Sequence, residues 1–140
     1  MEKKLKQLAK TLRIIDKVRF EGWQGDVSSY YKTADVFVST SDFEGYGLTL
    51  VEAASVRCPI VTTPVGIAQD VLRDGTSVLV CRDRSPSCFA RAIIKILTTP
   101  EFRTEIADAA FFAMSEVSAT ESAYLEQYKH SLEALLVPKQ

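Results

Sequence analysis

Residues 35–56 read DVFVSTSDFEGYGLTLVEAASV, a short apolar run followed by a polar loop with two glycines and a second apolar stretch. The run at 35–39 is rich in β-branched and aromatic residues, which predicts a strand covered on both faces. Residues 48–56 contain no glycine or proline and predict a helix. A buried strand, a glycine loop and a helix in this order are typical of an α/β protein.

Three further apolar runs outside this stretch predict strands. They lie at 59–63 and 77–81, with a weaker one at 18–21. Helix-sized intervals separate them, and strands that alternate with helices form a parallel sheet with right-handed crossovers. We therefore expect an α/β fold with a Rossmann-like, doubly wound parallel sheet of about four strands and flanking helices.

Local signals place the helices between these strands and after them. Asp26 is a candidate N-cap for a helix that reaches Ala34. A short helix is expected over 67–72, before the turn pair Asp74-Gly75. After Cys81 the strand signals stop, and the C-terminal third is expected to be helical. Its helices are predicted from Pro86 to Leu97, from Pro100 to Val117 with Phe102, Ile106, Ala109, Ala110, Ala113 and Val117 on one face, and over 120–136 with Tyr124, Tyr128 and Leu132 in one stripe.

The composition, with 46% apolar and 25% charged residues, is typical of a globular protein. We expect residues 1–140 to form one domain. Seventeen Lys and Arg against eighteen Asp and Glu argue against a nucleic-acid-binding protein, which would carry a basic stripe. No apolar run approaches the about 20 residues of a transmembrane helix. Cys58, Cys81 and Cys88 form neither an even disulfide framework nor a Cys-x-x-Cys pair, and a lone His130 builds no histidine metal site. We expect a reduced, cytoplasmic domain without a metal.

Positive charge is concentrated at the N-terminus. The first twenty residues contain seven Lys and Arg against two acidic residues. Such a helix can lie on an anionic membrane. The favoured interpretation is a surface helix with solvated lysines and one buried stripe, formed by Leu5, Leu8, Leu12 and Ile15.

The loop after the strand at 35–39 is the best candidate for a ligand site. Ligands of open parallel sheets bind at the carboxyl ends of the strands. Gly45 and Gly47 allow a ligand to approach the backbone, and the following helix offers free N–H groups. Glu44 lies just before that helix, and Glu52 lies about one and a half turns into it. The alternative is that these acids only complement the helix dipole, and spacing alone does not decide between the two.

Two common nucleotide motifs are excluded at this loop. A dinucleotide fingerprint needs a third glycine, and Leu50 stands in its place. No Gly-Lys-Ser/Thr occurs in the chain, so there is no phosphate-binding P-loop.

Residues 39–53, STSDFEGYGLTLVEA, resemble the signature of the group 1 glycosyltransferases, the retaining nucleotide-sugar enzymes with the GT-B fold. That signature has two glutamates separated by seven residues, and Glu44 and Glu52 match it. The resemblance covers residues 18–136 in order, and its further parts are FEGW at 20–23, YKTADVFV at 31–38, PIVTTPVG at 59–66, Asp74-Gly75 and Leu79-Val80.

The resemblance implies a role for each matching residue. Glu44 would accept hydrogen bonds from hydroxyls of the donor sugar, and Glu52 from the ribose hydroxyls of the nucleotide. The Gly66 loop would approach the donor. No nucleophile or general base is assigned, and no metal or cofactor besides the nucleotide sugar is implied. The backbone N–H groups that would hold the sugar or its diphosphate belong to Gly45, Tyr46, Gly47 and Leu48.

Three residues depart from the family pattern. Arg57 stands where the family usually has a glycine, Ile67 where a second glycine follows Gly66, and Asp70 where a glutamate is usual. Without the second glycine, we expect less room for the donor phosphates to approach the backbone.

The resemblance extends only to the later part of the C-terminal, nucleotide-sugar-binding domain of a GT-B enzyme. The acceptor-binding domain, and the Arg/Lys pair that neutralises the diphosphate, have no counterpart in the sequence. We therefore expect a truncated domain of a hexosyltransferase of polysaccharide or glycoconjugate biosynthesis, inactive without its N-terminal half. Its expected partners are a nucleotide-sugar donor and either a chain that supplies that half or a second copy. The alternative is a non-catalytic α/β docking or sugar-nucleotide-binding module.

The sequence also predicts whether three side chains near these motifs are buried or exposed. Trp23 can stack on a base or a sugar, although burial in the protein is favoured for so large an aromatic ring. Tyr46 is expected to be exposed between its two glycines. Cys58 is expected to lie in the core.

Overall fold

The computed structural model describes residues 1–117, 125–126 and 129. Its three strands are β1 (Phe37–Ser39), β2 (Ile60–Thr62) and β3 (Leu79–Val80). The helices are α1 (Glu2–Thr11), the 3₁₀ turn η1 (Ile15–Lys17), α2 (Ser28–Thr33), α3 (Leu48–Ser55), α4 (Ile67–Asp70), α5 (Pro86–Thr98) and α6 (Pro100–Val117). The stripe expected at Tyr124, Tyr128 and Leu132, and His130, lie outside the described residues.

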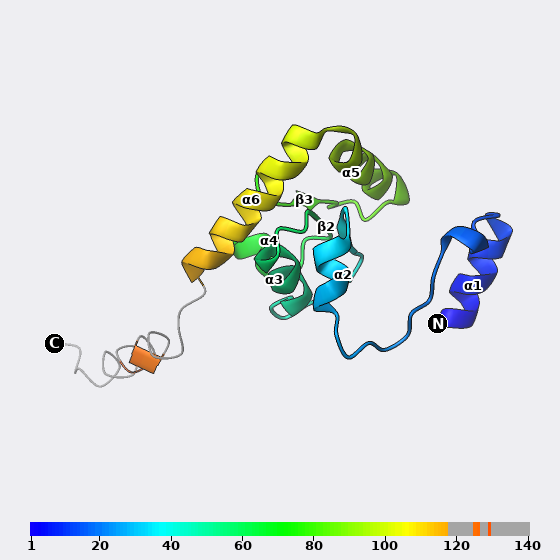
Figure 1. The fold of residues 1–140 in the computed structure, drawn as a ribbon, viewed down its shortest axis with the longest axis horizontal. Helices are drawn as coiled ribbons and strands as arrows, with labels where there is room; N and C mark the ends of the chain where they lie inside the picture. Colours follow the sequence, from blue (N-terminus) through cyan, green and yellow to red (C-terminus); the bar gives the residue numbers. More distant parts are fainter. Residues whose placement is uncertain (118–124, 127–128, 130–140) are drawn as a thin grey trace.

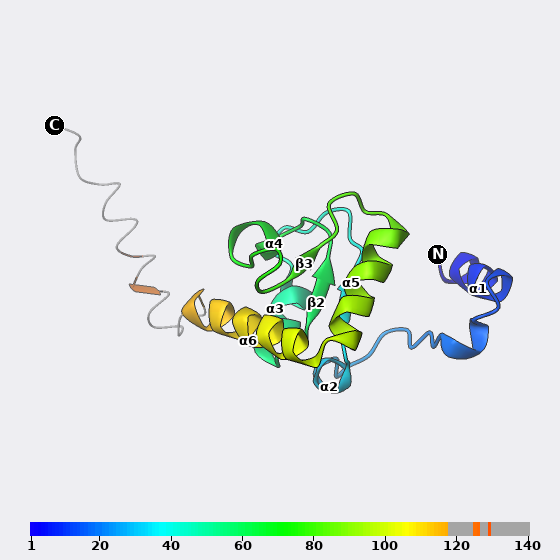
Figure 2. The ribbon, with the colours of Figure 1, turned by 90° about the horizontal axis from the view of Figure 1, so that it is seen from above.

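The strands form a parallel sheet in the order β1-β2-β3 (Figures 1 and 2). Val38 pairs with Val61 in β2, and Val61 pairs in turn with Leu79 in β3. The α/β class and the parallel sheet expected from the sequence are confirmed. The expected fourth strand at 18–21 is wrong, because this segment pairs with no strand and its Phe20 ring lies under Lys6 of α1, 5.3 Å from Nζ to the ring centroid.

Helices cover both faces of the sheet and give the domain its two hydrophobic clusters. Alternate strand residues point to opposite faces. Ile60 packs on one face with α3, α4 and α6, and its neighbour Val61 packs on the other face with α5. The fully buried side chains include Leu50, Ile67, Ile96 and Ile106. Each such side chain stabilises the fold by about 1.5–3 kcal/mol relative to an exposed one.

The helix boundaries follow the sequence signals closely. The Asp26 carboxylate accepts hydrogen bonds from the N–H groups of Ser28 (3.0 Å) and Ser29 (3.4 Å), so it caps α2 as expected. Ser85 caps α5, with Pro86 in the first turn. The buried face of α6 is shifted from the expected one, since Val117 is exposed and the face consists of Ile106, Ala107, Ala110 and Met114.

The N-terminal helix α1 does not pack as expected. It lies apart from the sheet and its covering helices in both views (Figures 1 and 2). Its expected buried stripe is exposed, and within α1 only Ala9 is buried. Trp23, in the segment that joins η1 to α2, is 90% exposed, so its expected burial is also wrong. The exposed stripe residues are Leu5, Leu8, Leu12 and Ile15.

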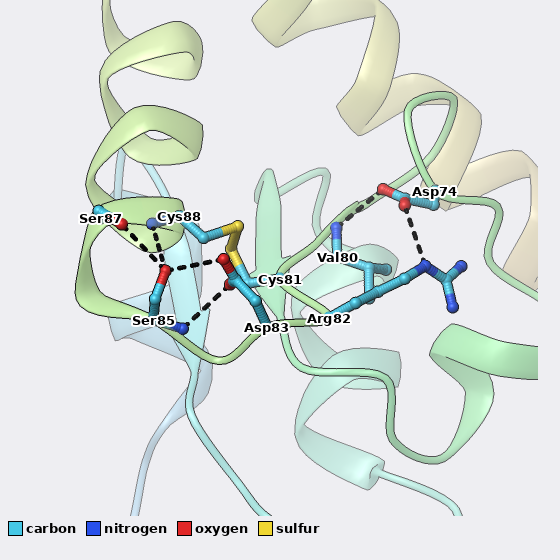
Figure 3. Close-up of a disulfide and its surroundings, with 8 residues drawn as sticks. All are labelled: Asp74, Val80, Cys81, Arg82, Asp83, Ser85, Ser87 and Cys88. Atoms are coloured by element: carbon cyan, nitrogen blue, oxygen red, sulfur yellow. Dashed lines mark hydrogen bonds and ion pairs between the residues drawn. A yellow bond between two sulfur atoms is a disulfide. The ribbon is translucent and has the colours of Figure 1, made fainter.

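A disulfide joins Cys81, at the end of β3, to Cys88 in the first turn of α5 (Figure 3). The expectation of three reduced cysteines is therefore wrong. The chain reverses direction between these two residues, where Ser85 Oγ donates to Asp83 (2.9 Å) and accepts from the Cys88 N–H (3.1 Å). Cys58 is free and buried, as expected of a core residue, and burial raises the pKa of its thiol.

Arg57 ends α3 with a left-handed backbone, at φ +57°. This conformation explains why a glycine suits the position. The Arg57 side chain compensates by joining α3 to α6. Its Nε lies 2.7 Å from Asp108 Oδ1, and its guanidinium lies 3.7 Å from the centroid of the Phe111 ring.

Substitution of Arg57 separates the backbone strain from the side-chain contacts. Arg57→Ala loses both contacts and keeps the left-handed strain, so we expect it to lower the free energy of unfolding by about 1 kcal/mol. Arg57→Gly loses the same contacts but relieves the strain, and should be more stable than Arg57→Ala by about 1 kcal/mol. Urea unfolding of the three proteins measures both differences. Equal stability of the two variants would contradict this account.

Candidate functional site

The loop between β1 and α3 is held in shape by its own hydroxyl groups. Ser41 Oγ donates to Glu44 Oε1 over 2.8 Å, and Ser39 Oγ donates to Ser41 Oγ over 3.4 Å. Thr63, directly after β2, donates its hydroxyl to the carbonyl of Ser41 over 2.5 Å. Glu44 is therefore fixed at the carboxyl edge of the sheet and is half-buried.

The loop after β2 packs directly on this first loop at Gly66. Gly66 has a positive φ of +49°, and a Cβ there would overlap the carbonyl oxygen of Tyr46 and lie 2.6 Å from its carbonyl carbon. The N–H of Ile67 donates to that same Tyr46 oxygen over 2.9 Å. Only a glycine fits at 66, so the two loops form one surface.

Gly47 turns the chain into α3. It is the N-cap residue, with φ +83°, and its carbonyl accepts the N–H groups of Leu50 and Val51. The first N–H groups of a helix have no partner within the helix and point outward, at the positive end of its dipole. Tyr46 and Leu48 flank this end and are 52% and 67% exposed, so Tyr46 is exposed as expected.

Glu52 lies on α3, more than one turn from its start, and faces α2. It lines a cavity of about 480 Å³ together with Asp26, Tyr31 and Val51. Burial, followed by the hydrogen bond to Glu52 and its negative charge, raises the pKa of Tyr31 to about 12. The Glu52 carboxylate thus lies close to the buried Tyr31 in the wall of this cavity.

A further residue, Arg84, reaches the glycine loop from outside it. Its guanidinium donates to Asp42 Oδ1 over 2.9 Å and to the Asp42 carbonyl over 3.1 Å. Arg84 lies in the segment between the two disulfide cysteines and has a φ of +53°. The sequence analysis missed this contact, because no local pattern relates two residues 42 positions apart.

The structure brings together the loop from Glu44 to Leu48 and Gly66, and it places Glu52 on the α2 side of α3. One carboxylate and a set of backbone N–H groups at a helix start suit a ligand with vicinal hydroxyls and anionic oxygens. Ile67, one of the three departures, buries its side chain in the core, so it does not project into the Gly66 loop. Its N–H is engaged by Tyr46. Among the described residues no group of His, Cys, Asp and Glu forms a metal site, and no helix is long and apolar enough to cross a membrane.

The burial of Tyr31, together with the negative charge of Glu52, gives the protein a pH dependence at high pH. The folded state holds Tyr31 neutral up to about pH 12, whereas an unfolded tyrosine ionises near pH 10. This stabilisation is complete below pH 10 and is lost as the pH rises through about 12. We expect wild type to lose about 2 kcal/mol more than Tyr31→Phe across this window.

Urea unfolding at several pH values above 9 measures this difference. Tyr30→Phe, at the exposed neighbouring tyrosine, is the matched control and should follow wild type. Parallel pH profiles for wild type and Tyr31→Phe would contradict the raised pKa of Tyr31.

The family model of glycosyl transferases group 1 matches residues 1–111. The chain is 32% identical over 132 residues to a D-inositol 3-phosphate glycosyltransferase of Frankia alni, a match over 91% of this chain and 32% of that protein. It is 35% identical over 104 residues to the lipopolysaccharide core biosynthesis glycosyltransferase LpsE of Rhizobium meliloti, over 74% of this chain and 31% of that protein. The chain spans about a third of the length of these curated relatives.

Solved structures show the same fold. The C-terminal domain of LpcC, a glycosyl transferase group 1 family protein from Francisella tularensis, aligns with a TM-score of 0.74 at 23% identity, over 82% of this chain and 60% of that chain. Anabaena Alr3699/HepE in complex with UDP aligns with a TM-score of 0.85 at 22% identity, over 94% of this chain and 36% of that chain. The fold is therefore that of GT-B domains, as the sequence resemblance implied.

Proposed function

Because the chain belongs to the family of group 1 glycosyl transferases, we propose that it binds the nucleotide-sugar donor of a retaining sugar transfer. The observation that carries this proposal is the contact of Gly66 with the Tyr46 carbonyl, which joins the two loops at the carboxyl edge of the sheet. A rigid, partly backbone surface at this edge is where an α/β sheet binds its ligands.

The donor sugar binds at Glu44. Its carboxylate accepts from two vicinal hydroxyls, and Ser41 already orients one of its oxygens. The N–H groups of Gly45 to Leu48 face the sugar or its diphosphate, where the positive end of α3 favours anionic oxygens. The structure of HepE was solved with UDP, which supports a uridine nucleotide as the first donor to test.

The ribose binds at Glu52. The cavity beside this residue is formed by α2 and α3, and Tyr31 lines it together with Glu52. A carboxylate at this wall can accept hydrogen bonds from two vicinal ribose hydroxyls.

Glycosyl transfer is a property of the longer relatives, of which this chain spans about a third. We propose that residues 1–140 form one domain that contributes the donor side only. Transfer then requires an acceptor-binding domain and cationic groups for the leaving diphosphate. No metal or cofactor is proposed for the donor side.

A second candidate is a non-catalytic module that keeps the fold. Two observations favour it. The Ile67 N–H donates to Tyr46 and is therefore not free for a donor phosphate, and the Asp42 carboxylate pairs with Arg84. The two candidates differ in one property, which is the affinity for a nucleotide sugar.

Isothermal titration of UDP-, GDP- and ADP-sugars into the chain tests the proposal. We expect one nucleotide sugar to bind. Glu52→Gln and Glu44→Gln should each weaken it about 10- to 100-fold, because each removes charge-assisted hydrogen bonds to sugar hydroxyls. A nucleoside diphosphate without its sugar should lose affinity in Glu52→Gln and keep it in Glu44→Gln.

Glu105→Gln, at an exposed position of α6, is the matched control and should bind as wild type does. No binding of any nucleotide sugar by the folded chain would favour the non-catalytic module. Equal affinity of all the variants would place the donor elsewhere.

A further inference from the structure

The disulfide segment, residues 81–88, reaches the loop between β1 and α3 through the side chain of Arg84. Nη1 of Arg84 donates to Asp42 Oδ1 over 2.9 Å, and Nη2 donates to the Asp42 carbonyl over 3.1 Å. The second hydrogen bond holds the backbone of the loop itself, two residues before Glu44. Arg84 therefore constrains the chain next to the carboxylate that is proposed to bind the donor sugar.

The loop after β2 holds the loop between β1 and α3 at two other points. The Thr63 hydroxyl donates to the Ser41 carbonyl, and the Ile67 N–H donates to the Tyr46 carbonyl over 2.9 Å. Glu44 lies between these two points in the chain. A change in the contact from the disulfide segment is therefore confined to the stretch around Glu44, and the start of α3 stays in place.

The contact between Arg84 and Asp42 is too exposed to contribute much to global stability. The Asp42 side chain is 91% exposed and the Arg84 side chain 43%. Exposed ion pairs of this kind add little to the free energy of unfolding. Its effect is on the local geometry of the loop, which makes it a candidate for control of the site.

The backbone of Arg84 has an unfavourable conformation. Its φ of +53° lies in the left-handed region, which is costly for a residue with a Cβ. Such a conformation persists where the surrounding structure enforces it. Here the disulfide closes the segment into a ring, and within that ring the Arg84 N–H donates to the Cys81 carbonyl over 3.2 Å. Opening of the ring lets residue 84 return to a negative φ, which turns its side chain away from Asp42.

The disulfide can open without release of the helix that follows it. Cys81 is buried, whereas Cys88 is only partly buried, so a small thiol can reach the sulfur of Cys88. Phe89 and Ile96 anchor α5 in the same cluster as Val61 of β2. Reduction is therefore expected to relax the segment between the two cysteines and to leave the packing of α5 intact.

We propose that the disulfide is a reversible redox switch: its oxidised form holds Arg84 on Asp42, and this contact positions the loop for the donor sugar. The proposal rests on the proposed function and adds a regulation of the same site. Arg84 acts through the loop between β1 and α3, so it is a positioning residue and not a catalytic one.

The switch operates by thiol–disulfide exchange with a dithiol. A thiolate of the reductant attacks Cys88 Sγ, the S–S bond breaks, and Cys81 leaves as a thiolate that takes up a proton. The second thiolate of the reductant then attacks the reductant's own sulfur in the mixed disulfide, and Cys88 leaves and is protonated. The protein gains two electrons and two protons, and the dithiol becomes a disulfide. A disulfide oxidant reverses both steps.

Titration of UDP-glucose and of UDP into the oxidised and the reduced chain tests the proposal. We expect reduction with dithiothreitol to weaken UDP-glucose binding about 5- to 10-fold. The affinity for UDP should stay unchanged, because only the sugar contacts Glu44. In NMR spectra of the isotope-labelled chain without ligand, the amides of residues 42–44 should shift on reduction, and those of α3 should not. Reoxidation should restore both the affinity and the spectrum.

Variants of the switch should reproduce the reduced state. Cys88→Ser should bind UDP-glucose as the reduced wild type does, with no response to the dithiol. Arg84→Ala should have the same weak affinity in both redox states. Arg84→Lys keeps the ion pair with Asp42 but cannot also reach the carbonyl, so its affinity when oxidised should be intermediate.

Two variants serve as matched controls and should respond to reduction as wild type does. Arg82→Ala removes the other arginine of the same segment, whose side chain extends toward Asp74, with 3.8 Å between Nε and Oδ2 (Figure 3). Cys58→Ser removes the free cysteine, so it shows whether the dithiol acts through the disulfide alone.

The outcomes separate this inference from the proposed function. Near-UV circular dichroism establishes which proteins are folded. The switch is overturned if reduction unfolds the chain, if the amides of residues 42–44 do not respond to it, or if both redox forms bind UDP-glucose equally well. Equal binding leaves the proposed function standing. If neither form binds UDP-glucose or UDP, the proposed function fails, whereas a shift of these amides on reduction would still support control of the loop by the disulfide.

Discussion

The close approach of the Gly66 backbone to the Tyr46 carbonyl is the constraint on which the candidate site depends. The loop after β1 and the loop after β2 would diverge without it, since each leads to a different helix. Because Gly66 has no Cβ, the two loops can approach each other closely, and the N–H of Ile67 reaches the Tyr46 oxygen. This hydrogen bond fixes the chain just before Gly47. The start of α3 is thereby set against the sheet. Glu44 is held from the other side by Ser41, whose carbonyl accepts from Thr63.

This constraint is supported by packing far from the loop. Leu50 lies in the first turn of α3, and Ile67 lies at the start of α4. Both are buried in the same hydrophobic cluster as Ile60 of β2. Arg57 at the far end of α3 links that helix to α6 through Asp108 and Phe111. The site is consequently a rigid edge, and the helix that follows it cannot move without disturbing the core. Helix α1 lies apart from this packing, so a change in α1 should leave the donor side intact.

Much of this site could be predicted from the sequence, because it depends on local signals. The glycines at 45 and 47, the cap at Asp26 and the apolar run at 59–63 each specify their structure within a few residues. Predictions that needed a distant partner were less successful. The stripe of α1 and the segment at 18–21 have the pattern of buried elements, but pattern alone does not say what covers them. The pairing of Cys81 with Cys88 and the contact of Arg84 with Asp42 depend on how the chain turns after β3, and no spacing rule contains that turn.

The measurement that tests the central claim most directly is a titration of the isotope-labelled chain with UDP, followed at each backbone amide by NMR. If the two loops form one donor site, the amides of Gly45, Gly47, Leu48 and Gly66 should shift together and saturate at one concentration. Amides of α5 should stay unchanged. Shifts confined to residues outside the two loops, or separate saturation of the two loops, would contradict the account, because the loops would then not act as one surface.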